Sequence, residues 1–221
     1  MTREQWHVDT RREAFARLER MRDHWWWRPG WKIGRSFYTF HITFDGASEV
    51  IDLVGRYQQA LTLPTLDLVP AEGLHLTMQG VGFTDEVTRV DLDGIIIAAQ
   101  AHCARLTSFA VTLGPADADP EAVMLQVAPW QPVEELRAAV RAAIADVWGD
   151  SRVPETADGF TPHVSVAYSG ADTSAVLLRQ RLSGIEPMSV TTTVRAVQLI
   201  ELNRDQRAYR WTTIATMPLR G

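Results

Sequence analysis

Two short stretches, centred on His75 and His163, alternate apolar and polar residues, and each carries a hydroxyl side chain two positions after its histidine. The hydroxyl residues are Thr77 and Ser165, and the two histidines are 88 positions apart (163 minus 75). Alternation with a period of two predicts β-strands, in which residues i and i+2 project from the same face. Each stretch is therefore expected to present an imidazole and a hydroxyl side by side.

The order of predicted elements repeats along the chain. Each half is expected to run strand, helix, histidine strand, helix, strand. In the first half the predicted elements are residues 35–44, 48–61, the His75 strand, 84–105 and 108–113; in the second they are residues 122–127, 132–148, the His163 strand, 173–182 and a closing hairpin of 190–202 and 209–217. Pseudo-symmetric lobes, approximately 35–114 and 121–219, would bring the two histidines to equivalent places facing a shared cleft. A helix over 9–22 precedes them within an N-terminal arm, residues 1–34, and residues 35–221 are expected to form one bilobal domain.

Composition narrows the class of protein. The chain has 221 residues, 46% of them apolar, which is enough to bury a core, and its net charge of −5 argues against non-specific coating of nucleic acid. Lys32 is the only lysine, so there is no Gly-Lys-Ser/Thr phosphate loop. No apolar run approaches the length of a membrane span, and residues 1–12 do not resemble a secretory signal. The single cysteine, Cys103, is expected to be a buried thiol, and a reducing cytoplasm is the expected compartment.

A third tripeptide of the same kind occurs at His41-Ile42-Thr43. Six histidines should produce about one such tripeptide by chance, so the count alone decides little. His41 lies on the first strand of its half, and the corresponding strand near Gln126 has no histidine. For His41 a partly buried strand histidine is favoured over a neighbour that contacts substrate.

The N-terminal arm is basic and rich in tryptophan. Residues 1–35 hold nine Arg or Lys against five Asp or Glu, and five of the eight tryptophans lie in the first 31 positions. The arm is expected to pack its indoles onto the main body, and its Trp and Arg side chains could at the same time cap a substrate cleft. Arg28 and Arg35 are candidate phosphate contacts, although solvated surface charge is the default. Phe160 and Tyr168 are candidate base-stacking residues, although core positions are more usual for aromatic side chains.

Residues 70–78 with the nearby Gly80, residues 160–167, and the closing hairpin with Tyr209 resemble the two-histidine (2H) phosphoesterase superfamily, also called the LigT-like or 2′-5′ RNA ligase family. The resemblance covers about residues 35–219; one departure is Ser165, where many members carry threonine. It implies an α+β, bilobal LigT-like fold, with two pseudo-symmetric lobes of mostly antiparallel sheet, helices on the outside and a central cleft. It also implies metal-independent cleavage of a 2′,3′-cyclic phosphate or a related 2′,5′ phosphodiester, in a small cyclic nucleotide or an RNA 3′ terminus. No cofactor, metal, membrane or obligate protein partner is expected.

The chemistry of the motifs is consistent with that activity. Hydrolysis needs a base for the attacking water and an acid for the departing alkoxide, and imidazole titrates near neutral pH. His75 and His163 would fill these roles in an order that the sequence does not determine, while Thr77 and Ser165 would donate hydrogen bonds to the phosphate oxygens.

Three alternatives stay open at this stage. One is a nucleotide or RNA-end binding module that has kept the cleft but has little or no turnover. Another is a zinc site built from His41, His75 and His163, because three imidazoles and a water make a catalytic zinc sphere. RNA joining is a third, but only as the reverse of cleavage, because the near absence of lysine argues against ATP-driven ligation.

Overall fold

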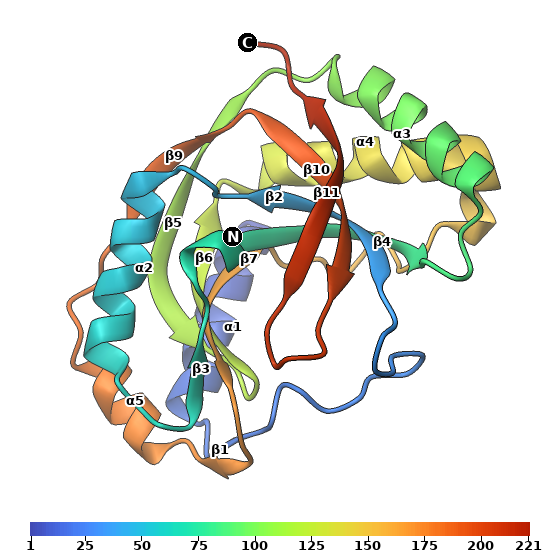
Figure 1. The fold of residues 1–221 in the computed structure, drawn as a ribbon. Helices are drawn as coiled ribbons and strands as arrows, with labels where there is room; N and C mark the ends of the chain where they lie inside the picture. Colours follow the sequence, from blue (N-terminus) through green and yellow to red (C-terminus); the bar gives the residue numbers. More distant parts are fainter.

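Two antiparallel sheets make up the body of the protein, whose computed structural model describes all 221 residues (Figure 1). The first sheet has the order β11-β10-β2-β4, from strands β2 (Phe37–Thr43), β4 (His75–Phe83), β10 (Ala196–Asn203) and β11 (Arg210–Pro218). The second has the order β3-β7-β6-β5-β9, from β3 (Leu66–Leu68), β5 (Phe109–Ala118), β6 (Ala122–Ala128), β7 (His163–Ser169) and β9 (Val190–Val194). A short ribbon pairs β1 (Arg20–Met21) with β8 (Thr173–Ser174).

Five α-helices pack around the two sheets. They are α1 (Arg3–Ala16), α2 (Ser48–Leu61), α3 (Arg89–Cys103), α4 (Trp130–Trp148) and α5 (Val176–Ser183), with 3₁₀ turns at Ala71–Gly73 and Asp150–Arg152. Helices α3 and α4 pack together against the first sheet, whereas α2 and α5 lie on the second (Figure 1). In α2 the apolar positions recur every three or four residues, so they form one buried stripe: Val50, Leu53, Val54, Tyr57 and Leu61. No helix is long and apolar enough to cross a lipid bilayer.

The two lobes are not contiguous in the sequence, in contrast to the predicted division at residues 35–114 and 121–219. Strand β5, from the first half, pairs with β6 in the second sheet, and the closing hairpin β10–β11 joins the first sheet through β2. The predicted strand 190–202 is two strands, β9 and β10, which belong to different sheets and meet at Arg195. Alternation identifies a strand but not its partner, which depends on long-range packing.

The predicted pseudo-symmetry is visible in the registers of the two histidine strands. His41 of β2 lies opposite Thr77 of β4, and Met124 of β6 lies opposite Ser165 of β7. In both pairs the register shifts directly beyond the hydroxyl residue, as at a β-bulge. Met124 is therefore the structural counterpart of His41, so the second lobe has no histidine at this position.

The N-terminal helix begins and ends earlier than the predicted 9–22. Thr2 caps it by accepting a hydrogen bond from the Gln5 amide, and the helix ends at Ala16. No residue of α1 is buried, and the helix is held by polar contacts such as the ion pair of Arg3 with Glu134 and a second pair between Arg11 and Asp117. A polar helix of this kind has no apolar stripe from which its boundaries could be predicted.

The rest of the N-terminal arm crosses the open side of the molecule below the β10–β11 hairpin (Figure 1). It is anchored by the β1–β8 ribbon, by the His24 amide, which donates to the Ser169 carbonyl (2.9 Å), and by Trp25. The Trp25 indole is buried and donates to Asp67 (2.8 Å), whereas Trp6, Trp26 and Trp27 are about half exposed. The expectation that the arm packs its indoles onto the body therefore holds for Trp25, but not for these three exposed indoles.

Candidate active site

One cavity of about 430 Å³ contains both histidine motifs. His75 and His163 are the first residues of β4 and β7, and each lies in the cavity wall with the hydroxyl residue two positions later. Since β4 and β7 belong to different sheets, the cavity lies between the two lobes. The four residues on which the sequence analysis centred are thus brought together by a single site.

Both histidines are oriented in the same way. The Nδ1 atom of His75 lies 2.8 Å from the Gly73 carbonyl oxygen, and Nδ1 of His163 lies 2.9 Å from the Thr161 carbonyl oxygen. A carbonyl can only accept, so Nδ1 carries the hydrogen and donates. In the neutral ring this leaves Nε2 as the free basic atom of each histidine.

His41 contacts both residues of the first motif, His75 and Thr77. Its ring is fully buried and is stacked on His75, with 4.4 Å between ring centroids and 4° between planes, and its Nε2 lies 3.3 Å from Thr77 Oγ1. Its Nδ1 has no hydrogen-bond partner. A buried unpaired N–H is rarer than a buried unpaired acceptor, which favours hydrogen on Nε2. That hydrogen bond leaves the Thr77 hydroxyl hydrogen free to point into the cavity.

Burial lowers the pKa of these histidines. The pKa of His75 falls to about 4, chiefly through desolvation, which outweighs the opposing effect of the hydrogen bond to Gly73; the positive charge of His163 lowers it further. Desolvation also lowers the pKa of His163, and it lowers that of His41 well below its ordinary value. In the free protein all three rings are therefore neutral at pH 7, and each Nε2 of the motif pair is able to accept a proton.

The family to which the chain belongs follows from comparison with known proteins. Residues 48–206, which include both histidine motifs, match the model of the 2′-5′ RNA ligase superfamily. The chain belongs to this superfamily. No curated protein sequence matches it.

Solved structures of LigT-like proteins share the fold of this superfamily member. TT0787 of Thermus thermophilus superposes with a TM-score of 0.64 at 19% identity, over 84% of this chain and 98% of that one. A structure described as a phosphoesterase gives 0.66 at 19%, over 84% and 99%. Escherichia coli LigT complexed with 3′-AMP gives 0.63 at 20%, over 85% and 99%. The α+β, bilobal LigT-like architecture is therefore established.

The superfamily match leaves out most of the N-terminal segments that line the cavity. His24, Arg28 and Trp31 all contribute to the cavity wall, and none lies within residues 48–206. His24 is buried, its Nε2 lies 2.8 Å from the Tyr209 hydroxyl, and its ring stacks on Tyr168 with 4.1 Å between centroids. Sequence analysis did not select His24, because it has no neighbouring hydroxyl residue and reaches the site only through the folding of the arm.

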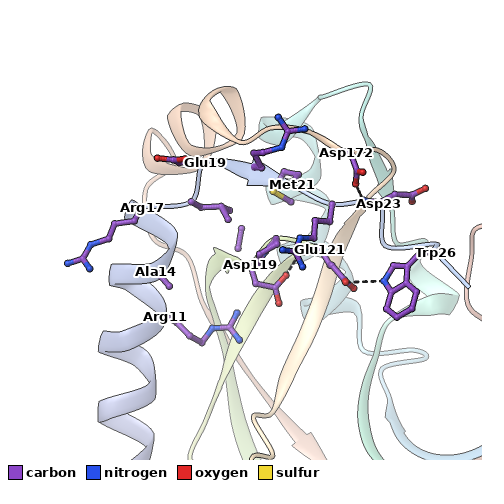
Figure 2. A pocket seen from close by; sticks show the side chains of 15 residues that line it. Arg11, Ala14, Arg17, Glu19, Met21, Asp23, Trp26, Asp119, Glu121 and Asp172 are labelled. Atoms are coloured by element: carbon purple, nitrogen blue, oxygen red, sulfur yellow. Dashed lines mark hydrogen bonds between the residues drawn. The ribbon is translucent and has the colours of Figure 1, made fainter. Parts of the chain in front are cut away.

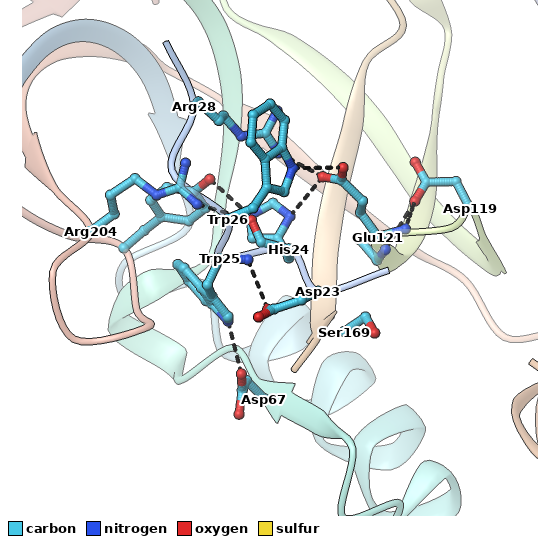
Figure 3. Close-up of polar contacts among 12 residues, drawn as sticks. Asp23, His24, Trp25, Trp26, Arg28, Asp67, Asp119, Glu121, Ser169 and Arg204 are labelled. Atoms are coloured by element: carbon cyan, nitrogen blue, oxygen red, sulfur yellow. Dashed lines mark hydrogen bonds and ion pairs between the residues drawn. The ribbon is translucent and has the colours of Figure 1, made fainter. Parts of the chain in front are cut away.

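The His24 ring is flanked by charges of both signs (Figure 3). Its Nδ1 lies 3.3 Å from Glu121, which also accepts hydrogen bonds from Arg28 (2.6 Å) and Trp26 (3.2 Å). Desolvation, reinforced by the positive charges of Arg28 and Arg204, lowers the pKa of His24 to about 3. His24 is thus a neutral link between the arm and the Tyr209 end of the hairpin.

Two of the four remaining candidate substrate contacts lie in the cavity wall, and two do not. Arg28 and Tyr168 line the cavity, whereas Arg35 and Phe160 do not. Arg35 forms ion pairs with Asp85 and Glu86, and its guanidinium lies over the Phe83 ring. Phe160 lies under the guanidinium of Arg137, 4.7 Å from its ring centroid. Arg35 therefore holds the arm in place, and Phe160 holds the 154–160 loop.

The zinc alternative finds no matching geometry. The structure contains no group of three or more His, Cys, Asp or Glu side chains placed to hold one ion. His41 is stacked on His75 and directs Nε2 towards Thr77, so the three imidazoles do not converge. Cys103 is fully buried away from the cavity, and desolvation raises the pKa of its thiol to about 11.

A larger hollow of about 1110 Å³ lies on another side of the arm (Figure 2). It is bordered by the end of α1, the β1 segment and the β5–β6 turn, and its charged side chains are mixed in sign, for example Arg11 and Arg22 with Asp119 and Glu121. None of the cavity histidines reaches it. The candidate active site is therefore the smaller cavity, which is distinguished by its paired imidazoles and not by its size.

The depressed histidine pKa values predict a loss of stability in mild acid. Folding favours the neutral rings, so their contribution is fully present above the ordinary value of 6.5 and is lost as the pH falls towards about 4 for His75 and about 3 for His24. We expect the free energy of unfolding, measured by urea titration, to decrease as the pH falls from 6.5 to about 5. Most carboxylates stay ionised over this interval, because their ordinary pKa values lie near 4. His24→Asn should flatten this decrease, and a free energy that is constant over the interval would contradict the assignment.

Proposed function

We propose that the protein is a phosphodiesterase that hydrolyses a 2′,3′-cyclic phosphate, or a related 2′,5′ phosphodiester, by paired-histidine acid–base catalysis. The observation that carries the proposal is the two-fold arrangement in one cavity: two Nε2 atoms free of protein partners, each with a hydroxyl two residues further along the same strand. Membership of the 2′-5′ RNA ligase superfamily supports it. So does the existence of E. coli LigT complexes with 3′-AMP and with phosphate, which are ligands of the expected class.

The proposed reaction uses one imidazole at each end of the displaced bond. A water oxygen attacks phosphorus while the Nε2 of one histidine removes its proton. The bond from phosphorus to the ribose 2′ or 3′ oxygen breaks, and the protonated Nε2 of the other histidine donates its proton to that oxygen. Thr77 and Ser165 donate hydrogen bonds to the non-bridging oxygens, where negative charge develops.

Binding of the anionic substrate favours protonation of one of the two histidines. Both histidines are neutral in the free protein at pH 7, yet the reaction needs one imidazolium. A bound phosphate anion favours the charged form of the adjacent ring and so raises its pKa. The arrangement therefore becomes an acid–base pair once substrate is bound, and neither proton transfer requires a metal ion.

A panel of substrates tests the proposal. It comprises the four nucleoside 2′,3′-cyclic monophosphates, an RNA oligonucleotide ending in a 2′,3′-cyclic phosphate, and 2′,5′- and 3′,5′-linked dinucleotides. We expect ring opening to a single phosphomonoester isomer, identified by ³¹P NMR, at a rate that EDTA treatment does not change. The 3′,5′-linked dinucleotide should be inert.

The alternative is a binding module on the same fold that has lost turnover. It would show saturable binding of a cyclic nucleotide with no product after prolonged incubation. That outcome, or a rate abolished by EDTA and restored by a divalent metal, would overturn the proposed hydrolysis.

A further inference from the structure

Arg204, at the turn between β10 and β11, is a buried cation without an acidic partner. Its side chain is only 4% exposed, and no carboxylate lies within ion-pair distance of it. Its Nη2 donates to the His24 carbonyl (2.9 Å), but its Nη1 is buried with no hydrogen-bond partner. A buried charge normally has a partner, because removal from water is otherwise costly.

Aromatic rings offset part of that cost. The guanidinium lies 5.6 Å from the Trp25 ring centroid and 5.8 Å from those of Trp31 and Tyr209. Ring faces attract a cation, but they do not neutralise its charge. The Arg204 charge and its unused N–H therefore remain available to an anion that enters the cavity, which Arg204 helps to line.

Arg28 stands beside Arg204 with a second unused donor (Figure 3). It lines the same cavity, its Nη2 donates to Glu121 (2.6 Å), and its Nε is buried without a partner. The only carboxylate in the cavity wall is that of Glu155. The wall made by the arm and the hairpin thus has an excess of positive charge, separate from the hydroxyls that serve the histidine pair.

We propose that Arg204 and Arg28 bind a second phosphate of the same substrate, so that the substrate is a mononucleotide with a terminal 5′-phosphate as well as its cyclic phosphate. This inference rests on the proposed function for the first phosphate. A cavity of about 430 Å³ is near the lower end of small-molecule sites, so both phosphates would belong to one compact molecule. A terminal phosphomonoester is mostly dianionic at neutral pH and suits a buried guanidinium better than the monoanionic diester of a longer RNA.

Binding measurements test the second phosphate site without relying on turnover. The probes are 3′-AMP, adenosine 3′,5′-bisphosphate and a trinucleotide with a 3′-phosphate, titrated by calorimetry at fixed ionic strength. We expect the wild-type protein to bind the bisphosphate at least about tenfold more tightly than either other probe. Equal affinities for 3′-AMP and the bisphosphate would overturn the proposal, and a trinucleotide that binds as tightly as the bisphosphate would overturn the assignment to a mononucleotide.

Arg204→Met is the variant that tests the residue, since it keeps most of the side-chain volume and removes the charge. The ratio of the two mononucleotide affinities should fall towards one, with Arg28 the only remaining guanidinium at the second phosphate, whereas Arg56→Met on the exposed face of α2 should keep the wild-type ratio. Circular dichroism and thermal unfolding establish that each variant is folded, and the wild-type comparison remains decisive if Arg204→Met is not. An unchanged ratio in folded Arg204→Met would contradict the role of Arg204.

Kinetics separate this inference from the proposed hydrolysis. Adenosine 2′,3′-cyclic phosphate with and without a 5′-phosphate should both be opened, with kcat/KM about tenfold higher for the 5′-phosphorylated form. Turnover of both at equal kcat/KM would remove the second phosphate site and leave the proposed function intact. Preferential binding of the bisphosphate without any turnover would do the reverse.

Discussion

Replacement of either His75 or His163 by alanine should lower kcat/KM for a 2′,3′-cyclic phosphate by about 10²- to 10⁴-fold, the usual contribution of a positioned acid or base. Each variant removes one of the two Nε2 atoms that face the shared cavity, so one proton transfer loses its catalyst. Steady-state hydrolysis of the preferred cyclic phosphate, followed as a function of pH, measures the loss. Each variant should also lose one limb of the pH profile.

The matched control for these variants is His102→Ala. His102 lies on α3, outside the cavity, where its Nε2 is 2.8 Å from Asp146. It should retain wild-type kcat/KM. If the two imidazoles act as an acid–base pair, as proposed, the double variant should be little worse than the poorer single variant. Retention of wild-type activity in both single variants would exclude paired-histidine catalysis.

Replacement of Arg137 by methionine should lower the free energy of unfolding by about 3 kcal/mol, because it removes three hydrogen bonds of a buried guanidinium and leaves the buried Met78 carbonyl without this donor. Arg137, on α4, is 6% exposed and donates to three carbonyls: those of Met78 (2.9 Å), Ala157 (2.9 Å) and Thr156 (3.0 Å). Met78 directly follows Thr77 on β4, and the 156–157 segment leads to His163. The guanidinium therefore links the two histidine motifs from outside the cavity.

Urea unfolding monitored by far-UV circular dichroism measures the effect of Arg137→Met. Arg56→Met, a change of the same chemistry at an exposed site on α2, should alter the free energy of unfolding by no more than about 0.5 kcal/mol. If Arg137→Met were as stable as Arg56→Met, the carbonyl contacts of Arg137 would not contribute to stability as inferred.

Local sequence was sufficient for several elements and for the centre of the candidate site. The stripe of α2, the alternation around His75 and His163, and the turn after Asn203 are each encoded by residues close together in the chain, and each is present in the structure. Regions that lack such a local pattern were predicted less well. The polar helix α1 begins at Arg3 instead of residue 9, and the boundary between β9 and β10 was not predicted.

The sequence alone determined that two histidines with hydroxyl neighbours lie on strands, that they occupy equivalent positions in a repeated order of elements, and that Cys103 is a buried thiol. Only the tertiary structure decided that β5 joins the second sheet while the closing hairpin joins the first. It also decided that His24 and Arg204 both line the cavity. Arg204 and His24 are 180 positions apart in the chain but share a hydrogen bond. The physical reason is that periodicity reports which face of an element is buried, whereas the choice of partner depends on which distant surfaces pack together when the whole chain becomes compact.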